Sequence, residues 1–244
     1  MLRTLTATVI VLLTCSINVL AQSESQEDLL KQIEAKRADL AVLENKILSP
    51  SAEDKAAFAE FLKQEDTGLT RLLPREKYDE TPKKMTLTVR GGGAYYSFDR
   101  LTHAYGYGSD IELQQGYLSV GFAGCDYGII LKAGAVSLDE ISVEHPSAFW
   151  LAAYKAAATE PQARIEQRRF MSRDGDTIEG IKYSNRVKAE VGMSYVLRSI
   201  NYDESDVLVA LKVVRQDTDG SLIIAWKLLQ KFPKPALARN LDAQ

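Results

Sequence analysis

The sequence predicts an α+β fold: a mostly antiparallel sheet with a two-helix insertion, preceded by an N-terminal helical hairpin. Three observations support this prediction. Residues 24–65 contain no glycine, and their apolar residues recur at helical spacing. From Met85 onward short apolar runs of period two are separated by glycines. Residues 187–230 hold three long apolar segments, which are typical of strands in the middle of a packed sheet.

Residues 1–21 have the pattern of a secretory signal peptide. Arg3 precedes an apolar run from about Thr8 to Leu13, and Ala21 is a small residue at the expected cleavage point. The run is shorter than the roughly 20 residues that span a bilayer. We therefore expect cleavage after Ala21, with no transmembrane segment in the mature chain, and a periplasmic or extracellular location.

The charge balance and the cysteines narrow the class of protein. The formal net charge of −3 becomes −4 on cleavage, because Arg3 is the only charged side chain lost. A mildly acidic chain lacks the basic footprint of nucleic-acid binding, so no nucleic-acid partner is expected. Cys125 is the only cysteine of the mature chain, so no intramolecular disulfide can form. An exported chain without disulfides fits a bacterial protein better than a eukaryotic extracellular one.

Residues 22–68 are expected to form a helical hairpin or a short coiled-coil arm. The first helix has a heptad seam made of Leu29, Ile33, Lys36, Leu40, Leu43 and Ile47. A second helix is expected from about Ala52 to Gln64, with Ser49 as its N-cap and Gly68 ending it. Such an arm either docks on a partner, for example as a homodimer through the N-terminal helices, or packs back on its own domain.

Residues 69–244 are expected to form one α+β domain. After a short strand at 85–89, the expected strands are 94–98, 111–115, 117–122, 127–132, 187–202, 206–216 and 221–230. Asp219-Gly220 is a favoured pair for the last hairpin turn. Two helices between Pro146 and Met171, the first with Phe149 and Trp150 on its apolar stripe, are expected to cover one face of the sheet. The N-terminal strands would cover the other.

The stretch from 89 to 110 is the candidate ligand site. It gathers four tyrosines around a single histidine, and the candidate ligand-binding residues are Arg100, His103, Tyr105, Tyr107 and Asp110. A cleft walled by tyrosine with charged groups at its rim suits a sugar, a peptide or a small polar ligand. The alternative is ordinary sheet packing, in which tyrosine rings are half-buried and their hydroxyls reach water.

Signals for catalysis, metals and cofactors are weak. The chain has no G-x-S-x-G elbow, and its two histidines, His103 and His145, do not have the close spacing of zinc ligands. Cys125, with His103 and Asp126 as partners, is the one nucleophile worth testing, although a lone cysteine between small residues is usually just packed. No metal and no cofactor are expected.

Two hypotheses follow from the sequence. The first is an exported, noncatalytic binding or interaction protein, because the arm is amphipathic and no catalytic motif is present. The second is a periplasmic hydrolase or small-ligand receptor that uses the tyrosine-rich loop around His103. Each hypothesis leaves the partner, a protein or a small ligand, without a specific identity.

Overall fold

The computed structural model describes residues 25–78, 93–106, 108–122, 124–172 and 174–238. The chain divides into two compact units, one ending at Ala41 and the other beginning at Val42. Among the residues that the structure describes, no helix combines the length and the hydropathy of a membrane span. The signal peptide and the strand expected at 85–89 lie outside the described residues.

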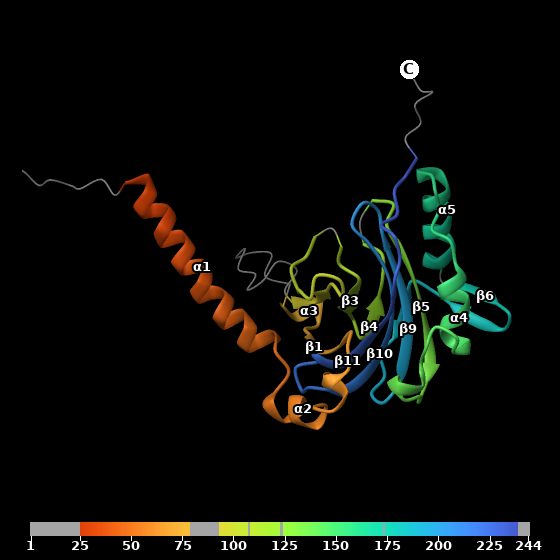
Figure 1. Cartoon of the computed structure of the whole chain (residues 1–244), viewed down its shortest axis with the longest axis horizontal. Coiled ribbons are helices and arrows are strands. Elements are labelled where there is room, and N and C mark those ends of the chain that lie inside the picture. Colours follow the sequence, from red (N-terminus) through yellow and green to blue (C-terminus); the bar gives the residue numbers. More distant parts are fainter. Residues whose placement is uncertain (1–24, 79–92, 107, 123, 173, 239–244) are drawn as a thin grey trace, which may run out of the picture. The chain divides into compact units, whose positions relative to one another are not determined.

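The second unit is organised around a five-stranded antiparallel sheet (Figure 1). Its order is β1 (Thr67–Leu72), β11 (Leu222–Lys231), β10 (Ser205–Gln216), β9 (Ser194–Asn201) and β5 (Tyr127–Gly134). The hairpin between β10 and β11 turns at Asp219 and Gly220, and Gly220 has a φ of 89°, which favours glycine. The predicted α+β class, with a mostly antiparallel sheet, is confirmed.

A smaller antiparallel sheet packs on one face of the central sheet. Its strands are β2 (Tyr95–Tyr96), β3 (Ile111–Gln114), β4 (Tyr117–Ser119) and β8 (Arg186–Lys188), in that order. Ile111 and Leu118 of this sheet share one buried cluster with Leu197, Val209 and Trp226 of the central sheet. Strand alternation explains the cluster, because every second side chain points to the same face.

Helices and a small hairpin cover the opposite face of the central sheet, as predicted (Figure 1). They are α4 (Pro146–Ala153), α5 (Glu160–Met171), β6 (Asp176–Ile178) and β7 (Ile181–Tyr183). Helix α4 buries Ala148 and Leu151, whereas Phe149 is 65% exposed. The prediction that Phe149 lies on the face of the helix that covers the sheet was therefore wrong. The helix ends at Ala153 and turns the face with Ala148 and Leu151 towards the sheet.

The segment 187–202, predicted as one strand, forms parts of two strands in different sheets. Lys188 ends β8 in the smaller sheet and Ser194 begins β9 in the central sheet. Gly192, with a φ of 84°, lies in the turn between them and donates its N–H to the Val213 carbonyl at 2.8 Å. The apolar period continues through this turn, so periodicity did not reveal it.

The N-terminal elements also differ from the prediction in detail. The long helix α1 spans Gln26–Leu48, but α2 covers only Ala52–Ala57 and is followed by the 3₁₀ turn η1 (Phe61–Lys63). Its N-cap is Ser51 rather than Ser49, and Ser51 forms a capping box with Asp54. Gly68 lies inside strand β1, opposite Trp226, and does not end a helix.

The described fold also contains two short helical elements and an isolated bridge at the edge of the central sheet. They are α3 (Arg75–Tyr78), which follows β1, and η3 (Leu138–Glu140), which follows β5, together with the isolated bridge between Ile130 and Ser184. The bridge joins the edge of the central sheet, at β5, to the segment that leads into β8. The two sheets are thereby held together at one edge as well as through their core.

Candidate functional site

Asp110, from the sequence-predicted loop, is fully buried in a polar network. Its Oδ2 accepts the backbone N–H of Phe98 at 2.7 Å, and its Oδ1 accepts the side-chain N–H of Asn201 at 3.0 Å. Burial raises the pKa of Asp110 to about 6, although hydrogen bonds with Ser199, with the Phe98 backbone and with Ser97 act in the opposite direction. The network ties the loop to β9, which is a structural use of the carboxylate.

His103 contacts the backbone of strand β1. Its Nε2 lies 2.8 Å from the Arg71 carbonyl oxygen and 3.1 Å from Thr70 Oγ1. Because a carbonyl can only accept, Nε2 carries the proton and donates it to Arg71. Burial lowers the pKa of His103, so the ring is held in its neutral form. Nε2 is thus not free to act as a base.

Arg100 and Tyr105 have partners of their own. The Arg100 guanidinium pairs with Glu204, in the turn between β9 and β10, and packs over Gly108. The Tyr105 ring packs at a tilt of 49° against the Tyr95 ring, with centroids 4.5 Å apart. Tyr107 lies outside the described residues. The four described residues of the predicted site therefore have separate partners in β1, β9, the β9–β10 turn and β2.

The other residues weighed for catalysis also have structural surroundings. His145 caps α4, because its Nδ1 accepts the Ser147 N–H at 3.2 Å. Burial raises the pKa of Cys125, and the nearby charges of Asp126 and Glu160 raise it further. A catalytic cysteine needs a lowered pKa to supply thiolate, so this environment favours the inert thiol.

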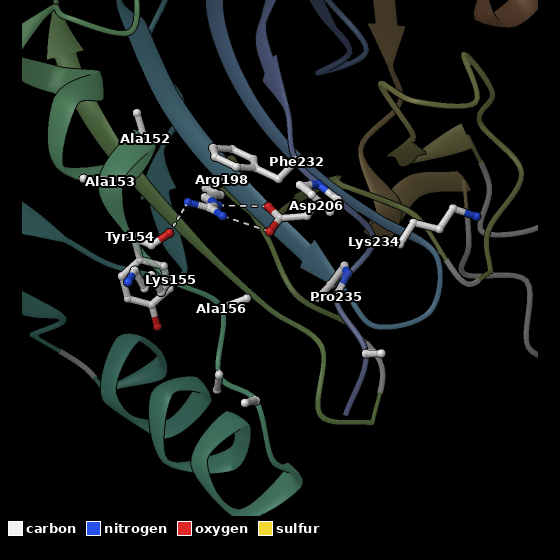
Figure 2. Close-up of a pocket in the computed structure, with 14 residues that line it drawn as sticks. Ala152, Ala153, Tyr154, Lys155, Ala156, Arg198, Asp206, Phe232, Lys234 and Pro235 are labelled. Carbon is white, nitrogen blue, oxygen red and sulfur yellow. Dashed lines mark hydrogen bonds and ion pairs between the residues drawn. The ribbon is translucent and has the colours of Figure 1, made fainter. Parts of the chain in front are cut away.

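A pocket of about 520 Å³ beside Arg198 was not found by the sequence analysis (Figure 2). Arg198 of β9 and Asp206 of β10 are both nearly fully buried, and they form a two-pronged ion pair with both distances 2.9 Å. The Arg198 guanidinium also donates to the carbonyls of Leu151 and Tyr154, at the C-terminal end of α4. A cation at this end is favoured by the helix dipole.

The walls of this pocket, called the Arg198 pocket below, come from two segments. One is the alanine-rich loop after α4, from 154 to 158, and the other is the chain after β11, from 232 to 236. The Phe232 ring lies over the Arg198 guanidinium, 3.6 Å from Cζ to the ring centroid. Backbone hydrogen bonds from Asp203 to Pro235 and from Ala238 to Ala158, both 2.8 Å, hold the second wall in place.

A tyrosine network fixes the first wall to the helices. The Tyr154 hydroxyl donates to Glu166 of α5 at 2.8 Å and lies 3.1 Å from the Tyr127 hydroxyl. Tyr127 in turn accepts the Ala157 N–H at 3.0 Å. Burial raises the pKa of Tyr154 well above its ordinary value. The phenol is therefore a neutral structural donor.

Cations predominate among the ionisable groups that line the Arg198 pocket. Its ionisable lining residues are Tyr154, Lys155, Arg198, Asp206 and Lys234. No serine, cysteine or histidine is among the described lining residues, and Asp206 is already engaged by Arg198. In the part of the chain that the structure describes, no group of three or more His, Cys, Asp or Glu side chains is placed to hold a metal.

A sequence signal for this pocket does exist. Arg198 is the one charged residue in the otherwise apolar or small run of β9, and Asp206 stands at the start of the apolar run of β10. A charge in a buried strand must be paired, so these two residues on neighbouring strands could have been matched. No family model, no curated protein and no solved structure matches this chain.

Proposed function

We propose that the chain is an exported, noncatalytic interaction protein that self-associates through helix α1. The single observation that carries the proposal is an uncovered apolar stripe along this helix. Leu29, Ile33, Leu40 and Leu43 lie at the seam positions and are 44, 44, 46 and 55% exposed. Export rests on the signal-peptide pattern of residues 1–21.

A long helix with such a stripe gains stability from a partner. An isolated helix is only marginally stable in water, and burial of an apolar face supplies most of the stability of helices in proteins. Outside the seam, α1 exposes Leu30 and Val42, but most of its other residues are charged, polar or alanine, and they include the i,i+4 ion pair between Glu27 and Lys31, at 2.9 Å. The stripe is thus the surface that a second helix would bury.

The partner that we propose is a second copy of the chain. Packing of knobs into holes along a seam of this length requires a helix of matching length. Helix α1 has 23 residues, whereas α5, the next longest helix that the structure describes, has 12 and packs on the central sheet. A second α1 supplies both the length and the seven-residue repeat. Lys36 within the seam weakens the coiled coil and keeps the association reversible.

The test is the mass in solution of the mature chain from Gln22, measured by sedimentation across a range of concentrations. We expect a dimer that dissociates on dilution. Ile33→Glu with Leu40→Glu places two charges in the seam and should leave a monomer. Ala38→Glu with Ala41→Glu adds the same charge on the opposite face of α1, and this control should remain dimeric.

A monomer at all concentrations would overturn the proposal. Hydrogen exchange of the wild-type monomer would then show whether the apolar stripe of α1 packs on the same chain or is left uncovered. Protection of the α1 amides that is lost in the Ile33→Glu, Leu40→Glu variant would show that the helix packs on its own chain. Dimers that form equally well in that variant would show that another surface mediates association.

A small-ligand receptor is the second candidate function, favoured by the Arg198 pocket. Its volume of about 520 Å³ lies within the range of small-molecule sites, and its walls are mostly apolar. A small amphiphilic ligand would place its apolar part against Phe232 and the alanines. Catalysis at the His103 loop is the weaker form of this candidate, because Nε2 of His103 already donates to Arg71.

Thermal-shift measurements with short-chain carboxylates, sugars and dipeptides test the receptor. We expect stabilisation by one of these classes in the wild-type chain and its loss in Ala156→Trp, because Ala156 lines the pocket and is only partly buried. Ala56→Trp, on the exposed surface of α2, is the matched control. Equal shifts in all three proteins would place the ligand elsewhere.

A further inference from the structure

A second hollow lies where the edges of the two sheets meet. It has a volume of about 810 Å³ and is lined mainly by strands β4, β5, β7 and β8. Strand β5 is at the edge of the central sheet and β8 is at the edge of the smaller one. The bridge between Ile130 and Ser184 holds the two edges together behind the hollow. We call this hollow the edge groove.

Positive charge is concentrated in the edge groove. Its charged lining residues are Lys132, Lys182, Arg186, Lys188 and Glu190, which together carry a net charge of about +3. The whole chain has a formal charge of −3, so the sign of the groove is opposite to that of the protein. A concave surface lined by one sign of charge attracts and concentrates ligands of the other sign.

The single carboxylate of the groove is already held by the cations. Glu190 accepts a hydrogen bond from the Lys132 ammonium at 2.8 Å. This bond and the Lys132 charge hold the pKa of Glu190 below its ordinary value, and the charge of Lys188 contributes in the same direction. Lys132 from β5 thus pairs with Glu190, and Lys188 from β8 lines the same groove.

The geometry of strand β8 sets the spacing between Arg186 and Lys188. Arg186 and Lys188 are two residues apart on β8, so their side chains leave the same face of the strand about 7 Å apart at the Cα atoms. The Arg186 guanidinium lies over the Tyr117 ring, 5.4 Å from its centroid. Tyr117 is paired with Lys188 in the ladder between β4 and β8. Arg186 and Lys188 therefore project from a strand that is hydrogen-bonded to β4 in the smaller sheet.

We propose that the edge groove binds a small multivalent oxyanion, a molecule with two or more phosphate or sulfate groups. The ligand needs two anionic groups because Arg186 and Lys188 present two cations on the same face of β8. Lys132 and Lys182 line the rest of the groove. Planar guanidinium and compact ammonium groups are the side chains that proteins use for such oxyanions. The groove volume suits a ligand of metabolite size. This site is independent of α1 and of the Arg198 pocket.

Inorganic triphosphate is the probe, with binding to the full mature chain measured by calorimetry at about 20 mM and about 150 mM salt. We expect binding at low salt that weakens at high salt. Arg186→Gln with Lys188→Gln should lower the affinity at least about tenfold, because both fixed cations are lost. Arg186→Lys with Lys188→Arg keeps the charge and should retain most of the affinity.

Lys55→Gln with Arg168→Gln is the matched control, since it removes one lysine and one arginine from the exposed surfaces of α2 and α5. Its affinity for triphosphate should stay within about twofold of the wild type. If this control loses as much affinity as the Arg186→Gln, Lys188→Gln variant, only the net charge of the protein matters, and the proposed site is overturned. Absence of any wild-type binding at low salt would overturn it as well.

A second arm distinguishes the source of the phosphate. Vesicles that contain anionic phospholipid are compared with free triphosphate, using the same variants in sedimentation with the vesicles. Binding of free triphosphate that depends on Arg186 and Lys188 supports the proposal. Binding to vesicles alone, without affinity for the free anion, would overturn the small-ligand form of the proposal and assign the groove to lipid headgroups.

Discussion

The indole of Trp226 lies directly against the backbone of Gly68. The two residues are opposite each other in the ladder between β1 and β11. A Cβ atom at position 68 would lie 2.2 Å from Cζ2 of the indole, a distance that real contacts do not allow. Glycine is therefore required inside β1 because an aromatic ring of the neighbouring strand occupies the space of its side chain.

Gly68→Ala should destabilise the protein by about 1 to 3 kcal/mol, because the rigid ring and the strand must move apart. Urea unfolding, followed by tryptophan fluorescence and circular dichroism, measures this free energy. The cost should fall below about 1 kcal/mol in a Trp226→Leu background, where the side chain can give way. A cost that is unchanged in that background would mean that the strain is in the backbone.

Removal of one partner of the buried Arg198–Asp206 ion pair should strongly destabilise the protein. Asp206→Asn leaves the Arg198 charge buried without a counter-ion, and we expect a loss of about 3 to 5 kcal/mol in the free energy of unfolding. Arg198→Met combined with Asp206→Leu removes both charges and should cost less than the single change. Urea denaturation of the three proteins checks the order. A double variant less stable than Asp206→Asn would show that the guanidinium's bonds to the α4 carbonyls dominate.

The pKa of Asp110 predicts a pH dependence of stability. The folded protein holds this proton up to pH of about 6, whereas the unfolded chain releases it near the ordinary value of 3.8. The contribution of Asp110 is therefore present below pH 4 and is lost as the pH rises to about 6. The stability of the wild type relative to Asp110→Asn should fall by about 2 to 3 kcal/mol between pH 4 and pH 7.

This difference is measured from urea midpoints of both proteins at the two pH values. Other groups titrate in the same range, among them Asp126, whose pKa burial raises to about 6. Their effect cancels in the comparison because both proteins retain them. A difference that does not change with pH would show that Asp110 is ionised throughout.

His145 has a capping role that a substitution can separate from catalysis. His145→Ala removes the acceptor for the Ser147 N–H and should cost about 1 kcal/mol, as for other N-caps. His145→Asn retains an acceptor at the same place and should recover most of this loss. Thermal unfolding at neutral pH measures both. If neither change affects stability, the cap is not needed to hold α4.

The sequence was most informative where the apolar period was long. Residues 206–216, 221–230 and the part of 187–202 that forms β9 were recognised as central strands because both of their faces are apolar, and both faces are covered. Strand β1 was missed because its residues alternate weakly and Gly68 looked like the end of a helix. The reason for that glycine is the ring of Trp226, far away in the sequence, and no local pattern encodes it.

The candidate site shows the same limit. Clustering of His103, Arg100 and Asp110 along the chain was visible, but their partners come from β1, from the β9–β10 turn and from β9. Arg198 stood out less in the sequence because it lies in an apolar strand, yet it forms the floor of a pocket. Proximity in sequence was a poor guide to which polar groups meet, since the sheets bring together residues from distant segments.

The pairing of β1 with β11 determines when the central sheet can form during synthesis. Strand β1 ends at Leu72 and β11 begins at Leu222, so β1 is synthesised long before the strand with which it pairs. A nascent chain that stops short of residue 222 leaves β1 without its neighbour and exposes one edge of β10, which invites pairing with other chains. The central sheet can therefore be completed only after residues 222–231 have been synthesised.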